Sequence, residues 1–255
     1  MIPISILATG HTDALEYACK YLQGQGLCVH RTPAGTVTHV LLPVPSLEPD
    51  GRIKGGGVLS DLLQCLPKNV TIIGGNLEHP LLADYNKIDL LQDAGYLARN
   101  ARITAYCAIA LAMQTLPCTL DRLAVLVIGW GRIGKCLAQL LAAMGADVTV
   151  AARKETDRAT LASLGYRTVD IPRIHPDEYG LIYNTAPQMI LPECKGDALK
   201  IDLASAPGIG SNDVVWARGL PNKMAPESSG QLIADTVTSY LLRSEEHTSE
   251  LQSLC

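Results

Sequence analysis

Hydrophobic residues along this chain fall into short, almost fully apolar runs that alternate with segments of helical periodicity. Before residue 100, this pattern predicts strands at 2–8, 27–30, 37–44 and 70–74, with helices at 12–22 and 58–66. Fully apolar strands are typical of a parallel sheet that helices cover. We therefore expect the first part of the chain to form a small α/β domain.

The second half repeats the pattern at greater length. A mostly apolar helix is predicted at 103–115, just before Pro117, and it is expected to link two domains. Further strands are predicted at 123–128, 147–151, 166–170, 181–184, 199–203 and 214–217, and helices at 132–144, 157–164 and 228–242. This alternation is typical of a doubly wound parallel sheet, the Rossmann arrangement. The predicted domains are 1–100 and 119–242, with a linker helix over 101–118 and a last helix that returns to the first domain.

A glycine fingerprint lies where the strand at 123–128 passes into the helix at 132–144. Its three glycines follow the G-x-G-x-x-G spacing, in which they permit a tight turn, the approach of a pyrophosphate and close packing of helix on strand. The free N–H groups at the helix start attract the anion. An ordinary glycine-containing turn is the alternative, but the strand, helix and strand in register favour a dinucleotide site at Gly129, Trp130, Gly131, Arg132, Ile133 and Gly134.

The end of the next strand indicates which dinucleotide is preferred. Enzymes that use NAD usually place an acidic residue there for the ribose hydroxyls, whereas residues 151–154 read AARK. A guanidinium suits a 2′-phosphate, so we predict NADP, with Arg153 as its main ligand and Lys154 or Arg158 assisting. NAD stays possible, because two acidic residues follow and the segment also fits a solvated basic loop.

Composition limits the classes of function. The chain has 255 residues, 47% of them hydrophobic, and a net charge of −4. The length allows two modest domains, and the negative net charge does not indicate a nucleic-acid-binding protein. No apolar run is long and uncharged enough to span a membrane, and the first residues lack the basic start of a signal peptide. We expect a cytoplasmic protein without nucleic-acid or membrane partners.

The cysteines do not form a recognisable site. Eight are present, without a C-x-x-C pair, so neither a metal site nor a disulfide framework is predicted. Most lie in apolar stretches, and we expect them to be small buried hydrophobic residues in a reducing compartment.

The last residues, 243–255, differ from the amphipathic helix before them. The string RSEEHTSELQS at 243–253 matches the translation of a common sequencing-library adapter. We expect this segment to be foreign to the protein, and we assign no function to His247 or Cys255.

Three polar clusters follow predicted strands or precede the last helix. They read NTAP at 184–187, DLASAPG at 202–208 and PNKMAPESSGQ at 221–231. Ligands of open α/β sheets bind beyond the carboxyl ends of the strands, so these clusters are candidates for the site, although turn residues occur in any loop.

Together the motifs resemble those of a known family. The segment VLVIGWGRIGKCLAQLLAAMGADVTVAAR, followed by NTAPQMIL, IDLASAPGIG and LPNKMAPESSGQLIAD, is similar in order and spacing to the A subunits of dipicolinate synthase from spore-forming bacteria. The resemblance covers about residues 100–240 and is weaker over residues 1–99. Ile209 stands where the family has a second glycine.

The resemblance implies NAD(P)-dependent oxidation of dihydrodipicolinate to dipicolinate, in the mother cell during sporulation, and a partner in the form of a flavodoxin-like B subunit. Hydride removal needs the substrate ring held against the nicotinamide, and its two carboxylates need cations or N–H and hydroxyl donors. We expect Asn184, Thr185 and Pro187 to line the nicotinamide ribose. We expect the substrate to contact Ser205, Lys223 and Arg102.

No catalytic base is assigned, because none of the histidines before the tail follows a predicted strand of the cofactor domain. Two other functions stay open. One is an NADP-dependent dehydrogenase of the 2-hydroxyacid or shikimate type, which should carry a well-placed His with a carboxylate partner or a Lys–Asp pair. The other is a non-catalytic NADP-binding subunit.

Overall fold

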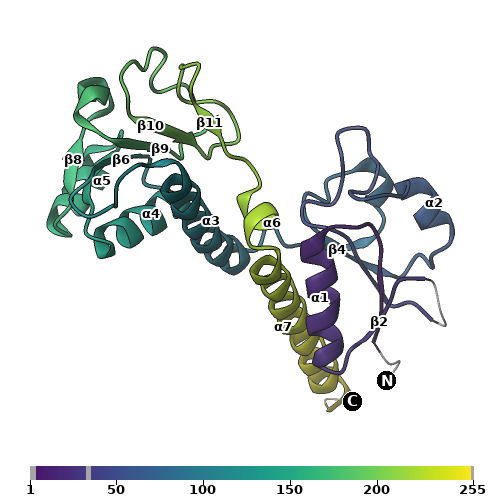
Figure 1. Cartoon of the computed structure of the whole chain (residues 1–255). Coiled ribbons are helices and arrows are strands. Elements are labelled where there is room, and N and C mark those ends of the chain that lie inside the picture. Colours follow the sequence, from purple (N-terminus) through teal and green to yellow (C-terminus); the bar gives the residue numbers. More distant parts are fainter. Residues whose placement is uncertain (1–3, 33–35, 254–255) are drawn as a thin grey trace. The chain divides into compact units, whose positions relative to one another are not determined.

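The structure, a computed structural model, describes residues 4–32 and 36–253. Its chain forms two compact units (Figure 1). Unit 1 comprises residues 1–100 and 225–255, and unit 2 comprises residues 101–224. Unit 1 is thus assembled from two segments that are far apart in the sequence.

Unit 1 contains a five-stranded parallel sheet in the order β2-β1-β3-β4-β5. Its strands are β1 (Ser5–Ala8), β2 (Cys28–His30), β3 (His39–Leu41), β4 (Thr71–Gly74) and β5 (Asn86–Asp89). The first four were predicted from their apolar runs. The fifth was not, because its first two residues are polar and exposed and hide the pattern.

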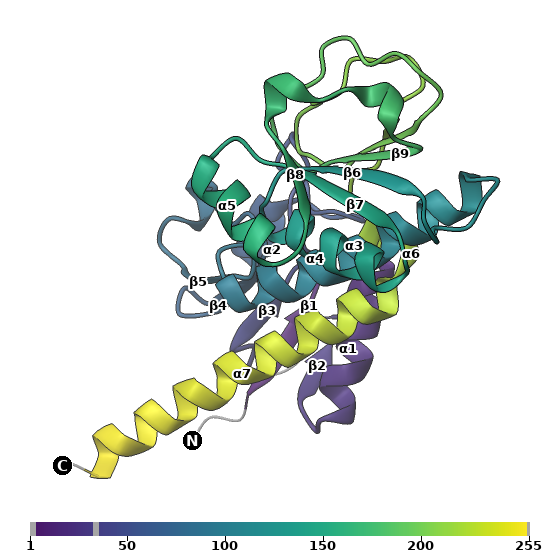
Figure 2. The ribbon, with the colours of Figure 1, turned by 90° about the vertical axis from the view of Figure 1, so that its left-hand side faces the viewer.

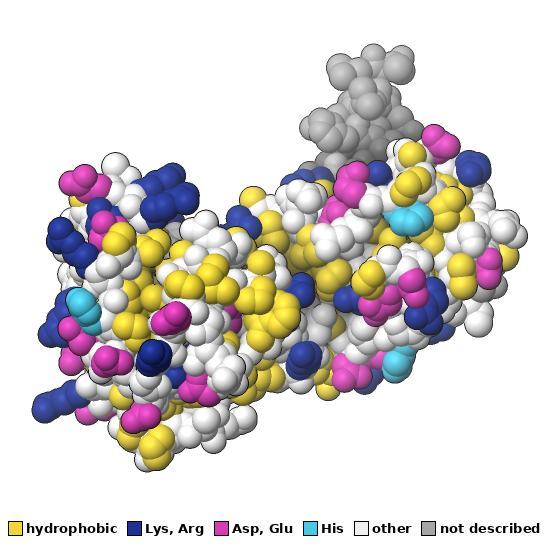
Figure 3. All heavy atoms as spheres, turned by 90° about the horizontal axis from the view of Figure 1, so that it is seen from above, with side chains coloured by type: hydrophobic (Ala, Val, Ile, Leu, Met, Phe, Trp, Pro, Cys, Tyr) yellow, Lys and Arg dark blue, Asp and Glu magenta, His cyan; other side chains and the backbone are white. Residues whose placement is uncertain are grey.

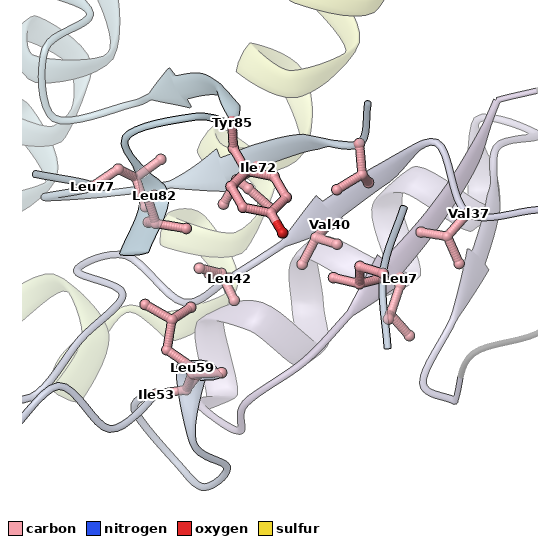
Figure 4. Close-up of a cluster of buried hydrophobic side chains, with 12 residues drawn as sticks. Leu7, Val37, Val40, Leu42, Ile53, Leu59, Ile72, Leu77, Leu82 and Tyr85 are labelled. Atoms are coloured by element: carbon pink, nitrogen blue, oxygen red, sulfur yellow. The ribbon is translucent and has the colours of Figure 1, made fainter. Parts of the chain in front are cut away.

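Helices cover both faces of this sheet. On one side, α2 (Leu59–Gln64) and the 3-10 helix η1 (Pro80–Leu82) lie beside a buried cluster in which Leu7, Val40 and Ile72 come from the strands (Figure 4). Helix α1 (Asp13–Gly24) packs against α7 (Pro226–Ser253). Gly230 makes this contact close, since a Cβ there would lie 2.6 Å from the Ala14 carbonyl oxygen.

Unit 2 contains a six-stranded parallel sheet in the order β11-β10-β9-β6-β7-β8. Its strands are β6 (Ala124–Ile128), β7 (Asp147–Ala151), β8 (Arg167–Val169), β9 (Leu181–Asn184), β10 (Leu199–Asp202) and β11 (Val215–Trp216). In order along the chain this is the 3-2-1-4-5-6 arrangement of dinucleotide-binding sheets, with the switch between β6 and β9. The predicted fold class, a parallel α/β sheet of Rossmann type, is confirmed.

Three helices lie on one face of this sheet, as Figure 2 shows: α3 (Ala94–Thr115), α4 (Arg132–Ala143) and α5 (Glu155–Ser163). Helix α3 begins nine residues before the predicted helix at 103–115. Tyr183 of β9 fixes it to the sheet, donating its hydroxyl to the Ala108 carbonyl at 3.0 Å.

The other face is covered mainly by irregular chain. The 3-10 helices η2 (Ile171–Arg173) and η3 (Pro176–Glu178) belong to these segments, and Leu191, Cys194 and Ile209 pack there against Leu126 and Ile182 of the sheet. The short helix α6 (Leu220–Met224) ends unit 2.

The cysteines only partly follow the prediction. Cys19, Cys107 and Cys194 are buried, and burial raises the pKa of the Cys19 thiol to about 11. The expectation of burial is wrong for Cys28, Cys65 and Cys118, which are exposed.

Within the described ranges, no helix is long and apolar enough to cross a membrane. Basic and acidic side chains are interspersed on the face seen in Figure 3. The side chains of 244–255, the segment expected to be foreign, lie outside the described part of the structure.

Candidate functional site

The candidate site is a cavity of about 440 Å³ in unit 2, at the carboxyl ends of β6, β7 and β9. This is the edge where open parallel sheets bind nucleotides, next to the switch between β6 and β9. The loop after each of these strands contributes to its walls, which are formed by Ile128, Gly129, Trp130, Gly131, Ala151, Ala152, Arg153, Lys154, Asp157, Ile171, Thr185, Ala186, Pro187 and Gln188.

Each fingerprint glycine has a separate structural reason. Gly129 has a φ of +102°, a conformation that side chains disfavour. At Gly134, a Cβ would lie 2.1 Å from the Gly129 carbonyl oxygen, so only glycine allows α4 to pack here. At Gly131, by contrast, a Cβ would meet no protein atom within 4 Å, although the residue lines the cavity. The protein itself does not require a glycine there, whereas the approach of a pyrophosphate does.

The start of α4 is open to an anion. Gly131 is its N-cap and supplies no side-chain hydrogen bond to the first turn. The unpaired N–H groups and the positive end of the helix dipole therefore face the cavity wall beside Gly131. A pyrophosphate fits these donors, so the residues present suit a dinucleotide cofactor.

Trp130 contributes an aromatic wall beside the helix start. Its ring meets Tyr166 edge-on at 6.1 Å, and the Lys135 ammonium lies 5.6 Å from the ring centre. Lys135 and Tyr166 do not themselves line the cavity, so they contact the indole from outside it. Arg132 and Ile133, which the sequence also assigns to the cofactor, belong to the first turn of α4 and do not line the cavity.

The cations expected to select NADP lie at the cavity end formed by β7. Arg153 and Lys154 line it and are exposed. No ion pair joins either side chain to another described residue. Asp157 lines the same wall and adds a negative charge. Arg158 does not line the cavity, and its Nη1 atom donates to protein oxygens.

Asn184 has a different role from the one expected. Its side chain is fully buried, and its amide donates to Asp202 Oδ1 at 2.8 Å and to the Ala186 carbonyl at 3.0 Å. Its own oxygen accepts the Ala186 N–H at 3.1 Å. Asn184 therefore does not line the cavity, and it shapes the loop that carries Thr185 and Pro187, which do line it.

Asp202 continues this buried network into the next loop. Its carboxylate accepts the Asn184 amide and the backbone N–H groups of Ala204 at 3.0 Å and Gly208 at 2.7 Å. These contacts bend the DLASAPG segment so that Ser205 is exposed at the carboxyl edge of the sheet. Ile209, which departs from the family pattern, is buried beside Leu191, so its side chain belongs to the hydrophobic core.

Two residues proposed for substrate lie elsewhere in unit 2. Arg102 projects from α3 toward α4, where it donates to Gln139 at 3.4 Å and to the Tyr106 hydroxyl at 3.2 Å. It does not line the cavity, so its predicted contact with a substrate carboxylate is not supported. Lys223 is exposed on α6, and its contact with substrate stays a prediction.

The third predicted cluster is divided between the units. Lys223 belongs to unit 2, whereas the serines and Gly230 belong to α7 in unit 1. Ser229 is buried, and Gly230 serves the packing on α1. Gly230 in this cluster is therefore explained by the packing of α7 on α1.

Part of this domain matches a known family model. Residues 95–182, from α3 to β9, match the NAD-binding domain of D-isomer specific 2-hydroxyacid dehydrogenases. This range contains the fingerprint and the three strands around it. The chain therefore carries an NAD-binding domain of the dehydrogenase type.

A curated relative covers more of the chain. The dipicolinate synthase A subunit of Bacillus subtilis (strain 168) is 31% identical over 160 residues, which are 56% of this chain and 53% of that protein. The resemblance to the A subunits of dipicolinate synthase is confirmed. The match spans about half the length of the B. subtilis protein.

Solved structures show the same fold. The dipicolinate synthase A subunit from Bacillus halodurans superposes with a TM-score of 0.81 at 21% identity, covering 94% of this chain and 99% of that one. The dipicolinate synthase A chain from B. subtilis superposes with a TM-score of 0.79 at 23% identity, covering 97% of this chain and 98% of that one. At these identities the likeness establishes the fold.

Proposed function

We propose that this chain is an NADP-preferring dipicolinate synthase A subunit that oxidises dihydrodipicolinate to dipicolinate. The observation that carries the cofactor part of the proposal is Gly131, which the fold does not require but a bound pyrophosphate does. The similarity to the B. subtilis dipicolinate synthase A subunit supports the choice of substrate. A site of action in the mother cell of a sporulating bacterium and partnership with a flavodoxin-like B subunit belong to the same proposal.

A nicotinamide cofactor held here would supply the hydride acceptor for this oxidation, in which the substrate loses a hydride and one proton and becomes aromatic. In this proposal the start of α4 binds the pyrophosphate, and Thr185 and Pro187 position the nicotinamide ribose. Arg153 and Lys154 bind the 2′-phosphate. Ser205 donates a hydrogen bond to a substrate carboxylate, and Lys223 pairs with one.

The proton has no protein acceptor in this scheme. No histidine lines the cavity within the described residues. Asp157 is at the β7 end of the cavity, away from the nicotinamide loop. Aromatisation supplies the driving force, so release of the proton to water suffices.

The test uses the full chain with freshly prepared dihydrodipicolinate and NADP, with and without a flavodoxin-like B subunit. Dipicolinate is followed by its absorbance and NADPH by its own. Formation of both in equal amounts supports the proposal. The matched control is Gly131→Val, which fills the pyrophosphate position and should abolish turnover without unfolding the chain.

A non-catalytic NADP-binding subunit is the second candidate, because cofactor binding alone accounts for the described residues that line the cavity. It predicts NADP binding without turnover in either mixture. That result would reject the proposed oxidation and leave the cofactor site intact.

A further inference from the structure

Arg158 makes an unusual set of contacts beside the candidate cofactor site. It lies on the first turn of α5, and its side chain is 21% exposed. One guanidinium nitrogen, Nη1, donates to the Ala152 carbonyl at 2.7 Å, to the Arg153 carbonyl at 2.9 Å and to Asp170 Oδ1 at 3.0 Å. A largely buried cation is thus bound to two successive backbone carbonyls and one carboxylate.

These contacts connect two walls of the cavity. Ala152 and Arg153 belong to the β7–α5 loop, whereas Asp170 follows β8 and accepts the N–H of Ile171 at 2.9 Å. Ala152, Arg153 and Ile171 all line the cavity. Arg158 and Asp170 do not line it, so they act on it through the backbone.

The electrostatic consequence concerns the backbone oxygens. Two carbonyls turned toward Arg158 cannot turn toward a bound phosphate, which they would repel. Asp170 offsets the charge of Arg158, while Arg153 and Lys154 keep theirs available. The loop therefore presents cations to the cavity and directs its carbonyls away from it.

We propose that Arg158 and Asp170 form a positioning pair that sets the preference for a 2′-phosphorylated cofactor, by fixing the backbone from which Arg153 projects. This inference rests on the proposed NADP site. Neither residue contacts the cofactor, so their effect on its phosphate passes through Arg153.

The decisive experiment is a double-mutant cycle on the full chain, with NADP and NAD titrated by calorimetry. Arg158→Ala should lower the affinity for NADP by about tenfold and the affinity for NAD by less than about twofold. If Arg158 acts through Arg153, the variant carrying both Arg153→Ala and Arg158→Ala binds NADP no more weakly than Arg153→Ala alone. Additive losses would show that Arg158 acts independently of Arg153 and would overturn the proposal.

The control is Arg167→Ala, which removes an exposed arginine of β8 that does not line the cavity and should leave both affinities unchanged. Should Arg158→Ala unfold, Asp170→Ala provides a milder test, because this side chain is 40% exposed. It should lower NADP affinity selectively, and unchanged selectivity would refute the pair.

Other failures are separable. Equal losses for NADP and NAD would mean that Arg158 supports the whole site rather than the 2′ position. A wild-type chain that binds NAD alone would overturn both this inference and the proposed cofactor. Absence of dihydrodipicolinate turnover would affect only the proposed reaction, since the cycle measures binding.

Discussion

The second and third glycines of the fingerprint, Gly131 and Gly134, should respond in opposite ways when each is replaced by alanine. At Gly134 the added methyl would lie 2.1 Å from a backbone oxygen, and α4 would have to move away from β6. Overpacking costs about 1–3 kcal/mol, and a clash this close to a backbone atom belongs at the upper end, about 3 kcal/mol; the better helix propensity of alanine returns about 1 kcal/mol. We expect a net loss of about 2 kcal/mol, or about 4–8 °C in melting temperature for a chain of this size.

Gly131→Ala should leave the fold nearly unchanged. Its φ of −80° suits any residue, and a Cβ there has open space. Because alanine is a poorer N-cap than glycine, we allow a loss of about 0.5 kcal/mol. The methyl does occupy the path of a pyrophosphate, so NADP affinity should fall at least about tenfold.

Thermal unfolding by circular dichroism and calorimetric titration with NADP measure the two effects separately. Gly24→Ala in unit 1 is the matched control: it too has open space, and it should change neither NADP affinity nor the stability of unit 2. If Gly131→Ala binds NADP as tightly as the wild type, or if Gly134→Ala melts at the wild-type temperature, the reasoning from Cβ positions is wrong.

Three further predictions concern polar groups of unit 2. Asp202→Ala should lower both the affinity for NADP and the melting temperature, because three donors lose a buried acceptor. A variant with wild-type affinity and melting temperature would refute the role of Asp202 in shaping the loops. Tyr183→Phe should cost about 1 kcal/mol in urea unfolding by removing the bond to Ala108, with NADP affinity unchanged. The hydrogen bond from Lys200 lowers the pKa of Asp213 in the folded chain. The ionised carboxylate therefore stabilises the fold above its unfolded pKa of about 3.9, and this stabilisation is lost as the pH falls through the lower folded pKa. Asp213→Asn should therefore be less stable than wild type at neutral pH, and the gap in unfolding free energy should close below about pH 4; a gap independent of pH would contradict this linkage.

The fold was largely predictable because its strands are buried on both faces. Strands β7 and β9 begin and end where the apolar runs do, and α4 begins where the fingerprint places it. The fifth strand, Asn86–Asp89, could not be found this way, since an edge strand with polar exposed residues has no apolar run.

The site was predictable only where backbone chemistry determines it. The fingerprint and the Arg153–Lys154 end of the cavity follow from strand order, which a sequence reveals. The role of Asn184 did not follow, because a polar residue at a strand end can face the ligand or hold a neighbouring loop. Its partner Asp202 lies 18 positions away in the sequence, so only the register of β9 and β10 pairs them.

The discontinuity of unit 1 affects how the chain acquires its structure during synthesis. Helix α1 emerges from the ribosome early, but its partner α7 follows only after all of unit 2. Until then the part of α1 that packs on Gly230, with Ala14 and Ala18, lacks this partner and is open to non-native association. Unit 2 is contiguous and can complete its sheet first, so a chain that stops before Gly230 should still acquire the nucleotide-binding sheet while unit 1 stays unfinished.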